Sequence, residues 1–298
     1  MIRRPPRSTQ SRSSAASDVY KRQPLGTIKI TATSTGKVPN TSATAASSGS
    51  DLNGMAAKNA AEKIKSRMAE YLAAEAQIKP EAIAFKDGMV IVGANIYDFA
   101  EAVRRCYMGR ISLSATGFYS TPKVHWDPKT FKGRPFYYFA YGAACSEVAL
   151  DLLTGENRIL RADILHDVGR SLNPAIDIGQ IEGGYVQGAG WLTSEELVWD
   201  SKGKLLTHAP STYKIPACSD RPLDFRVQLF SEGENCEDTI HRSKAVGEPP
   251  LMLGTSVLMA LSFINLNPPL AIMTGSRIIF LVLIFLKTLM TASITSDE

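Results

Sequence analysis

The feature that most constrains the fold is a pair of long segments joined by one short polar turn. The first, residues 137–153, is long and apolar, and the second covers residues 158–168. Between them lies Thr154-Gly155-Glu156, a turn of the kind that connects antiparallel strands. The sequence therefore predicts a β-hairpin near the middle of the chain.

An amphipathic helix is predicted upstream of this hairpin, over about residues 51–76. Apolar residues recur there at every fourth position, which places them on one slowly drifting face of a helix. They are Leu52, Ala56, Ala60, Ile64, Met68 and Leu72. Charged side chains lie off that stripe, and Pro80 should stop the helix.

Several shorter elements are predicted from local patterns of apolar residues. They are strands at 27–33, 88–94, 203–208 and 224–230, a helix at 96–108, and a helix over about 176–197 that Asn173-Pro174 opens. Helices and strands are interspersed without a strict strand–helix–strand rhythm. We therefore predict a mixed α/β or α+β fold.

The net charge of +4 is unevenly distributed along the 298 residues. Residues 1–23 carry six basic side chains and one acidic side chain, and subtracting their +5 from the total leaves about −1 for the rest. Because the basic excess lies in this terminal stretch, it does not indicate a basic binding face. We expect no nucleic-acid partner.

The cysteines and histidines show no spacing typical of a metal site. Cys106, Cys145, Cys218 and Cys236 form no CxxC pair, and the four histidines are equally dispersed. Disulfide frameworks and zinc sites need closely spaced or paired residues. We therefore expect buried, reduced thiols, a cytoplasmic location, and no metal bound directly by side chains.

Both ends differ in character from the middle of the chain. Residues 1–23 are rich in Ser and Arg and poor in acids, as mitochondrial transit peptides are. They resemble a translated sequencing adapter more strongly, and we interpret them as a non-native tail. Residues 263–298 change character abruptly, and we interpret them as a divergent, frameshifted tail. The apolar run at 278–286 is shorter than the roughly 20 residues that span a bilayer, so we expect no membrane anchor.

Three stretches carry residues suited to binding or catalysis. The first, residues 44–51, has mostly small side chains just before the predicted helix. Small residues let a ligand approach the backbone, and the N–H groups of a helix N-terminus attract anions. An ordinary helix start, capped by Ser50 or Asp51, explains the same residues.

The second stretch is the predicted helix around Asp177. It carries five glycines within twelve positions: Gly179, Gly183, Gly184, Gly188 and Gly190. Each glycine destabilises a helix by roughly 1 kcal/mol relative to alanine, so their number needs a reason. Close packing against another element is one explanation, and close approach of a large cofactor is the other. The spacing does not match GxGxxG, which argues against a dinucleotide site.

The third stretch, residues 243–251, contains Glu248 between Gly247 and two prolines. Prolines restrict the backbone and hold the preceding residue extended. A carboxylate held rigidly among apolar neighbours is suited to act as a base near neutral pH. A solvated loop glutamate is the alternative interpretation.

Six motifs occur in order along the chain and are specific in combination. They are KVPNTSATAASSGSDLNGMA, TGFYSTP, YGAACSEVALDLLTGE, DVGRSLNPAIDIGQIEGGYVQG, APSTYKIP and SKAVGEPPLMLG. Over residues 24–262 they resemble the C-terminal half of the molybdopterin-binding domain of xanthine dehydrogenases, within the molybdenum hydroxylase or aldehyde oxidase family. The TGFYSTP and VPNTSATAAS forms favour xanthine dehydrogenase over aldehyde oxidase.

The resemblance implies an oxidoreductase of purine catabolism that hydroxylates xanthine or hypoxanthine with a molybdenum–molybdopterin cofactor. Glu248, in the GEPP motif, would be the base that activates a molybdenum-bound hydroxyl. The pterin would be carried by Ala46, Ser47, Ser48 and Gly49, by Gln180, and near Lys244 and Gly247. Molybdenum would be held through the pterin, without ligands from the protein.

The sequence departs from the family in several places. Ala43 stands where the family often has proline, and APST at 209–212 replaces a common GPST, both mild changes. The GGGFGGK-like segment, the purine-clamping residues, and the iron–sulfur and FAD domains do not occur. We expect iron–sulfur clusters and FAD in other domains or in partner subunits of a hetero-oligomer. The isolated chain is expected to be inactive and not to retain the cofactor.

Two alternatives to a xanthine-hydroxylating enzyme stay open at this point. One is a molybdenum hydroxylase that oxidises aldehydes or N-heterocycles. The other is a non-catalytic fragment that folds partly or associates with partner subunits. The motif forms favour the xanthine-hydroxylating enzyme, and the upstream residues that would separate it from the first alternative do not occur in this sequence.

Overall fold

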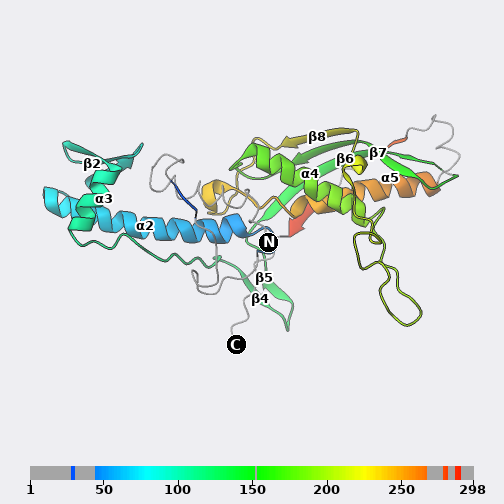
Figure 1. Ribbon diagram of the computed structural model, residues 1–298, viewed down its shortest axis with the longest axis horizontal. Coiled ribbons are helices and arrows are strands. Elements are labelled where there is room, and N and C mark those ends of the chain that lie inside the picture. The colour runs from blue at the N-terminus through cyan, green and yellow to red at the C-terminus, as the bar shows by residue number, and fades with distance from the viewer. Residues whose placement is uncertain (1–27, 31–43, 152, 267–277, 281–285, 290–298) are drawn as a thin grey trace. The chain divides into compact units, whose positions relative to one another are not determined.

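The structure is a computed structural model that describes residues 28–30, 44–151, 153–266, 278–280 and 286–289 (Figure 1). The chain forms two compact units, residues 1–133 and 134–298, and helices and strands occur in both. The mixed fold predicted from the sequence is therefore confirmed.

Three sequence predictions lie largely outside the described residues. The stretch at 1–23 is not described, and of 263–298 only short parts are. Of the predicted strand at 27–33, only residues 28–30 are described, and they are not part of a strand. The interpretations of the two tails therefore stay predictions.

Helix α2 (Gly49–Ala76) confirms the first predicted helix. Of its apolar stripe, Met68 and Leu72 are buried, whereas the members nearer the N-terminus are half-buried. The helix ends at Gln77, whose left-handed backbone (φ 55°) returns its N–H to the last turn. Pro80 comes later and opens the 3₁₀ helix η2 (Pro80–Ala82), so it follows the helix end and does not cause it.

An antiparallel meander follows, formed by β1 (Ile83–Lys86), β2 (Met89–Val92) and β3 (Asn95–Asp98). Strand β2 confirms the predicted strand at 88–94. The predicted helix starts too early, because residues 95–98 pair with β2 and α3 (Phe99–Met108) begins only after them. Buried apolar residues of α2, the meander and α3 form the core of this unit: Met68, Leu72, Ala73, Ile83, Phe85, Val90, Val92, Ala102 and Cys106.

Residues 111–120 form an extended strap along α2, in which half-buried and exposed residues alternate. Polar side chains on successive turns of α2 donate hydrogen bonds to every second carbonyl of the strap. The pairs are Asn59–Phe118 (2.7 Å), Lys63–Thr116 (3.1 Å) and Arg67–Ser114 (2.9 Å). Four helical residues advance about 6 Å and two extended residues about 6.6 Å, so the spacings of donors and acceptors agree. A small hairpin, β4 (His125–Asp127) and β5 (Lys132–Arg134), follows the strap.

The predicted central hairpin is confirmed as β6 (Phe139–Leu150) and β7 (Asn157–His166), which pair antiparallel. Gly155 provides the positive φ (77°) that the turn needs. Strand β8 (Asp224–Leu229), also predicted, joins β7 in parallel. Two short strands, β9 (Ile278–Phe280) and β10 (Leu286–Leu289), pair with the other side of β6 and complete a five-stranded sheet.

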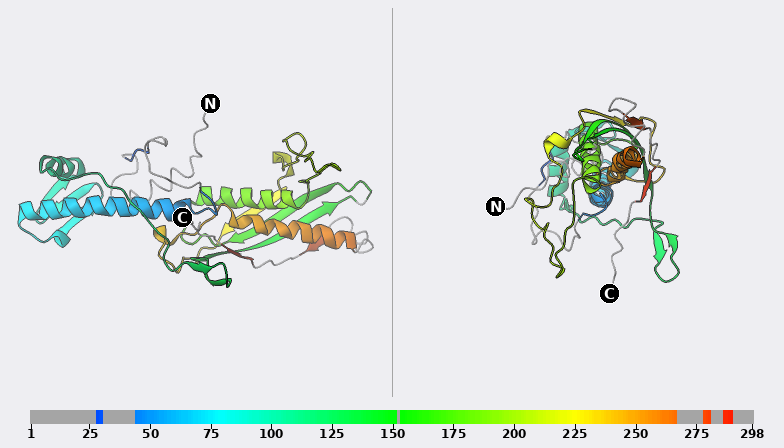
Figure 2. Two further views of the ribbon diagram at one scale, coloured as in Figure 1. Left: turned by 90° about the horizontal axis from the view of Figure 1, so that it is seen from below. Right: turned by 90° about the vertical axis from the view of Figure 1, so that its right-hand side faces the viewer.

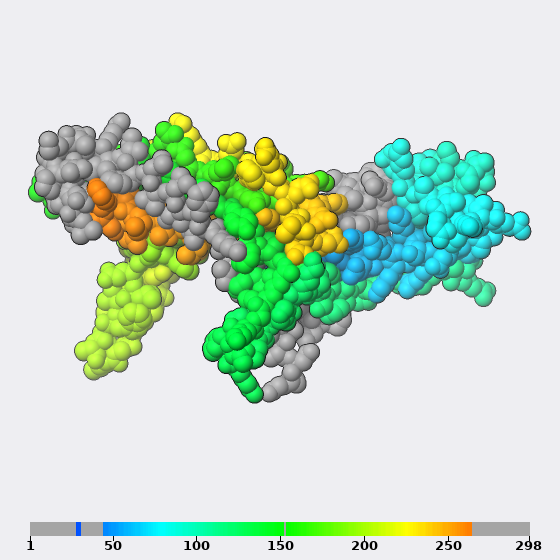
Figure 3. Space-filling model, turned by 180° about the vertical axis from the view of Figure 1, so that it is seen from behind, coloured from blue at the N-terminus to red at the C-terminus, as the bar shows by residue number. Residues whose placement is uncertain are grey.

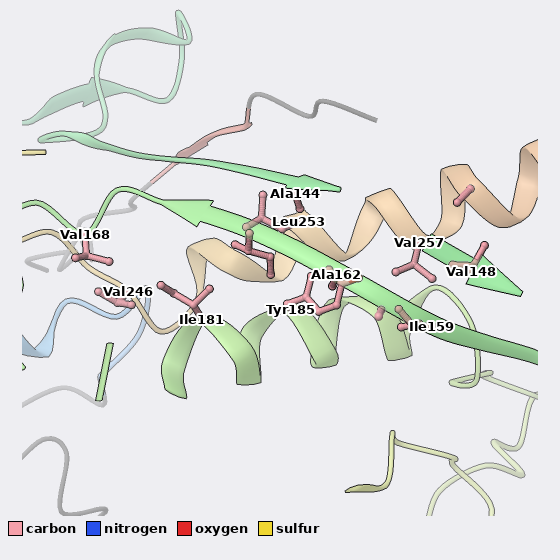
Figure 4. Packing of buried hydrophobic residues seen from close by; sticks show 13 residues of the cluster. Ala144, Val148, Ile159, Ala162, Val168, Ile181, Tyr185, Val246, Leu253 and Val257 are labelled. Atoms are coloured by element: carbon pink, nitrogen blue, oxygen red, sulfur yellow. The ribbon is translucent and has the colours of Figure 1, made fainter. Parts of the chain in front are cut away.

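Helices α4 (Pro174–Trp191) and α5 (Thr255–Leu266) lie side by side on one face of this sheet (Figure 2). Side chains from β6, β7, both helices and the 3₁₀ helix η5 (Pro249–Gly254) form the core beneath them (Figure 4). Ile181 and Tyr185 of α4 and Val257 of α5 are completely buried in it. Within the described ranges, no helix has both the length and the apolar character needed to cross a bilayer.

Helix α4 ends at Trp191, before the predicted end at 197. The Gly190 carbonyl accepts the N–H groups of Thr193, Ser194 and Glu195, which turns the chain sharply away from the helix axis. The segment that follows, residues 192–217, projects from the body of this unit (yellow-green in Figure 3). The helical pattern of apolar residues continues past the turn, but the backbone does not.

The predicted strand at 203–208 is also wrong. Asp200 accepts the N–H groups of Lys202 and Lys204 and so closes a tight turn. Only an isolated bridge, Trp199↔Leu205, forms around it. Two further 3₁₀ turns, η3 (Cys218–Asp220) and η4 (Ile240–Arg242), flank β8.

The four cysteines are free thiols, but they differ in exposure. Cys106 is buried in the core of the first unit, and Cys145 is half-buried on β6. Cys218 and Cys236 are exposed, so the expectation of buried thiols is wrong for these two. Both lie in surface turns, where the backbone places a short side chain in solvent.

Candidate functional site

The loop before α2 has a strained backbone. Ala46 and Ser47 have φ angles of 52° and 54°, a region that costs a residue other than glycine of order 1–3 kcal/mol. Ser48 is the N-cap, but its hydroxyl donates to the Ala45 carbonyl (2.9 Å) and makes no capping bond to the helix. The expected caps, Ser50 and Asp51, lie inside α2, so the capping explanation for this loop is wrong.

The arrangement of this loop fits an anionic group. A 28-residue helix starts at Gly49, and the N–H groups of its first turn point out of the helix end. The aligned peptide dipoles add a partial positive charge there. Small side chains at Ala46, Ser47 and Gly49 leave the backbone accessible to a ligand of that charge.

The start of α4 is a well-formed helix N-terminus. Asn173 accepts the N–H of Ile176 (3.3 Å), and Pro174 occupies the first helical position. Asp177 is buried and accepts a hydrogen bond from the Ser171 hydroxyl (2.6 Å). Gln180 is half-buried on the following turn, with a side-chain amide that can both donate and accept.

Three of the five glycines of α4 lie in close packing contacts, and at Gly188 and Gly190 a side chain would overlap its neighbours. A methyl group on Gly188 would lie 1.8 Å from the Leu251 carbonyl oxygen, and one on Gly184 would lie 3.1 Å from Pro250 Cβ. Gly190 is similarly close to Pro216. Helix α4 therefore packs directly on η5 at Gly184 and Gly188 and on Pro216 at Gly190, which confirms close packing as the reason for these three.

The other two glycines have no such reason. A methyl group on Gly179 or Gly183 would meet nothing within 4 Å. The two positions are one turn apart, and Gln180 lies three residues before Gly183 on the same side of the helix. For this open face the second explanation, close approach of a ligand, stays a prediction.

The segment that carries Glu248 is fixed on both sides. Upstream, Lys244 donates its N–H to the Val168 carbonyl (2.8 Å), and Ala245 donates to the Tyr138 hydroxyl (2.9 Å). Downstream, Pro249 and Pro250 are buried where η5 packs on α4. The side chain of Glu248 itself is exposed. The result is an exposed carboxylate mounted on a buried, hydrogen-bonded base.

The backbone of Glu248 differs from the prediction. An extended conformation was expected before Pro249, but Glu248 is helical (φ −97°, ψ −36°). Its carbonyl accepts the N–H of Leu251 (3.0 Å), which closes the first turn of η5. This bond and the burial of both prolines outweigh the steric preference of the residue that precedes a proline.

Lys244 is a buried ion-pair partner. Its side chain is 7% exposed, and its Nζ lies 2.5 Å from Asp167 Oδ2 and 5.2 Å from the centre of the Tyr141 ring. Sequence reasoning missed Asp167, although it opens the DVGRSLNP motif. A carboxylate placed directly after an apolar strand and before Gly169 was the available signal.

His166, next to Asp167, was also missed. It is 1% exposed, and its Nδ1 has no hydrogen-bond partner within the described residues. Burial lowers the pKa of His166 to about 4, although the neighbouring Asp167 carboxylate acts in the opposite direction. The imidazole is therefore neutral near pH 7 in the folded chain.

The candidate residues divide between the two units. The loop 46–49 belongs to the first, whereas Gln180, Lys244, Gly247 and Glu248 belong to the second. Within the second unit, the Gly247 carbonyl lies against Gly184, one turn beyond Gln180. Among the described residues no three His, Cys, Asp or Glu side chains gather as metal ligands would.

Comparison with known proteins identifies the family to which this chain belongs. A protein-family model for the molybdopterin cofactor-binding domain matches residues 14–222. The xanthine dehydrogenase of Dictyostelium discoideum is 47% identical over 241 residues, and the xanthine dehydrogenase/oxidase of Mus musculus is 47% identical over 238. Each match covers 80% of this chain but only 16% of the relative.

A solved structure agrees at the level of the fold. The quinoline 2-oxidoreductase from Pseudomonas putida 86 superposes with a TM-score of 0.70 at 23% identity. The superposition covers 87% of this chain and 32% of that protein. The fold, the family model and the similarity to xanthine dehydrogenases agree with the six motifs, and this chain belongs to the family of molybdopterin cofactor-binding domains.

Proposed function

We propose that this chain supplies the cofactor-binding part and the catalytic base of a molybdenum oxidoreductase that hydroxylates xanthine or hypoxanthine. The observation that carries the proposal is the exposed Glu248 carboxylate, held between a hydrogen-bonded segment and two buried prolines. Similarity to xanthine dehydrogenases supports the choice of substrate class. The rest of the enzyme, including iron–sulfur clusters and FAD, would come from other domains or partner subunits in the cytoplasm.

The residues present suit a pterin that ends in a phosphate or pyrophosphate. The backbone N–H groups at Ala46–Gly49 suit the anionic end, as helix N-termini do in other proteins. The Gln180 amide, with paired donors and an acceptor, suits the edge of a ring with alternating donors and acceptors. The open face at Gly179 and Gly183 leaves room for such a ring. Gly247 and the backbone near Lys244 would also contact the cofactor.

The bound cofactor would supply the two-electron redox chemistry of the reaction. Glu248 would accept a proton from the oxygen that is transferred to the substrate. A general base must come within about 2.6–3.2 Å of the atom that carries the proton. The position of the Glu248 carboxylate is therefore as important as its chemistry. The fixed segments on either side of Glu248 restrict its backbone before any substrate binds. Preorganisation of this kind lowers the cost of reaching the reactive geometry.

The test is the substitution Glu248→Gln in the complete oxidoreductase, with molybdenum content measured on the same samples. Loss of a general base is expected to lower kcat by about 10²–10⁴-fold while molybdenum content stays unchanged. Glu196→Gln, at an exposed position in the projecting segment, is the matched control and should leave kcat unchanged. Full activity of Glu248→Gln would overturn the assignment of the base.

The substrate is tested separately with the wild-type enzyme. Xanthine, hypoxanthine, an aromatic aldehyde and quinoline are each supplied at saturating concentration, and turnover is compared. The proposal predicts the fastest turnover with the two purines. Turnover of the aldehyde or quinoline alone would replace the purine by that class and leave the role of Glu248 to its own test.

A further inference from the structure

Lys244 lies four residues before Glu248, in the stretch that the resemblance assigned to the cofactor. Its ammonium group, however, is directed into the protein. The side chains of Lys244 and Asp167 are 7% and 11% exposed, and Nζ–Oδ2 is 2.5 Å. The Tyr141 ring covers the ammonium at 5.2 Å. The buried position of this charge therefore needs an explanation that does not involve the cofactor.

Stability is a poor explanation for a buried ion pair. Removing two charges from water costs about as much as their attraction returns, and well-packed apolar side chains often serve as well. What a buried pair does supply is geometry, because a slipped arrangement leaves both charges without a partner. The question is which geometry this pair fixes.

The pair fixes the register between two chain segments, residues 167–170 and 242–245. Lys244 N–H donates to Val168 O (2.8 Å), Arg170 N–H donates to Arg242 O (3.0 Å), and Gly169 and Ser243 form an antiparallel bridge. Asp167 uses its second oxygen to accept the Gly169 N–H (2.8 Å). One carboxylate therefore ties its own segment and the opposite segment at the same point.

Gly169 makes this register specific. Its φ is 62°, and a methyl group there would lie 2.3 Å from the Arg242 carbonyl oxygen. The two backbones are therefore in direct contact, and a slip by one residue would replace this contact with a side chain. Such a slip also moves every following residue by about 3.3 Å and turns its side chain to the opposite face.

A shift of that size matters for Glu248. Only three residues lie between Ala245, which donates a hydrogen bond to Tyr138, and the buried Pro249. One of them, Val246, is 1% exposed in the core. A change in register at Lys244 therefore reaches Glu248 with little room for the chain to absorb it.

We propose that the buried Asp167–Lys244 ion pair is a positioning device that fixes the register of residues 242–245 and thereby the place of the Glu248 carboxylate. The inference rests on the proposed role of Glu248 as the base. It gives Lys244 and Asp167 a function that acts through Glu248 and needs no contact with the cofactor or the substrate.

The test is a double-mutant cycle in the complete enzyme, with Lys244→Met made in the wild type and in Glu248→Gln. In the wild type, Lys244→Met is expected to lower kcat by about 10²-fold, the size of effect that a 1 Å misplacement can have, with KM nearly unchanged. In Glu248→Gln the same substitution should change kcat by less than about twofold, because the positioned group is already lost. Lys202→Met, at an exposed position, should have no effect in either background.

The outcomes separate the two proposals. A large effect of Glu248→Gln together with an equal effect of Lys244→Met in both backgrounds would overturn the positioning role and leave the base assignment intact. If Glu248→Gln had no effect on kcat, the assignment of Glu248 as the base would be overturned. The proposal that the ion pair positions a catalytic group would then be overturned as well. Lys244→Arg, which keeps a charge opposite Asp167, should recover part of kcat and covers the case in which Lys244→Met does not fold.

A second measurement needs no cofactor. Hydrogen exchange of the peptide that spans residues 240–252 is compared in the cofactor-free chain for wild type, Lys244→Met and the double variant Asp167→Asn/Lys244→Met. The double variant removes both buried charges and should recover the melting temperature that the single variant loses. Exchange should be faster than in the wild type in both variants. If the double variant had a normal melting temperature and exchanged as slowly as the wild type, the ion pair would not be what fixes this segment.

Discussion

The hydroxyl oxygen of Tyr185 on α4 lies 2.6 Å from the hydroxyl oxygen of Ser146 on β6, and both residues are at most 1% exposed. Ser146 also lies 2.6 Å from Ser256, whose hydroxyl donates to the Leu253 carbonyl in η5 (2.8 Å). A serine has one proton to donate, so Ser256 must accept from Ser146, and Ser146 must accept from Tyr185. The polar chain has one direction and ends on the turn that follows Glu248.

This direction predicts unequal costs for two substitutions. Tyr185→Phe removes a donor and should lower the free energy of unfolding by about 1 kcal/mol, the net value of one hydrogen bond. Ser146→Ala leaves the Tyr185 O–H without an acceptor in the core, and a buried unsatisfied donor costs about 1–3 kcal/mol. Urea unfolding measures both, with the exposed Ser201→Ala as control. A larger loss for Tyr185→Phe than for Ser146→Ala would contradict the direction.

Long periodic segments were predictable from the sequence, whereas short ones were predictable only in part: β2 and β8 were predicted, and β1 and β3 were not. The apolar stripe of α2 repeats over six turns, and the strands of the central hairpin are long enough for their turn to stand out. Strands β1 and β3 contain four residues each, too few to show a period, although Asp87-Gly88 between β1 and β2 is a known hairpin signal. The boundary of α3 was misplaced because β3 leads directly into the helix.

The candidate site was predictable as residues but not as contacts. Local patterns singled out Glu248 and two helix starts, at 44–51 and around Asp177, and the family resemblance then assigned Ala46–Gly49 and Gln180 to the cofactor. The partner of Lys244 is Asp167, 77 positions away, and nothing local to either residue indicates that they meet. The backbone of Glu248 depends on a hydrogen bond and on burial of the prolines, both of which are decided by tertiary packing.

His166 makes stability depend on pH in a defined window. Its pKa is about 4 in the folded chain against an ordinary value of 6.5, so the unfolded chain binds a proton that the folded chain does not. The contribution of His166 to the free energy of unfolding is therefore fully present above pH 6.5 and is lost as the pH falls from 6.5 to 4. Below pH 4 His166 causes no further change. The expected loss is roughly 3 kcal/mol.

The measurement is urea unfolding at intervals between pH 7 and 4 for the wild type and His166→Leu. The variant should lack most of the loss in that window, whereas His125→Leu, at an exposed position, should keep it. The pKa values of Asp151 and Asp224 are lowered by hydrogen bonds from backbone N–H groups and from Arg226, respectively, so these carboxylates act only below about pH 3.8. A slope in His166→Leu equal to that of the wild type would rule out His166 as the source.

The strap along α2 depends on Gly117. A methyl group there would lie 1.8 Å from the carbonyl oxygen of Ala56, an atom of the helix backbone that cannot move aside. Gly117→Ala is therefore expected to release residues 111–120 from α2 and to lower the free energy of unfolding by about 1–3 kcal/mol. Limited proteolysis followed by mass spectrometry should show new cleavage between 110 and 120. The exposed Ser120→Ala is the control, and an uncleaved Gly117→Ala strap would show that the hydrogen bonds from Asn59, Lys63 and Arg67 hold it without this contact.

The two kinds of glycine on α4 give the most direct test of where the cofactor lies. At Gly179 and Gly183 an added methyl group meets nothing, and alanine stabilises a helix by roughly 0.5–1 kcal/mol relative to glycine. Gly179→Ala and Gly183→Ala should therefore raise the melting temperature of the cofactor-free chain. Gly188→Ala should lower it sharply, because the methyl group would overlap the Leu251 carbonyl.

In the complete enzyme, Gly179→Ala and Gly183→Ala should be harmful, although they stabilise the cofactor-free chain. If the pterin approaches α4 at its open face, a methyl group at Gly179 or Gly183 occupies space that the ring needs, and molybdenum content per active centre should fall. A more stable protein that binds less cofactor is an outcome that helix packing alone does not produce. Unchanged molybdenum content in both variants would mean that these glycines face no ligand, and the cofactor contacts of the second unit would then have to lie at Gln180 and Gly247 without them.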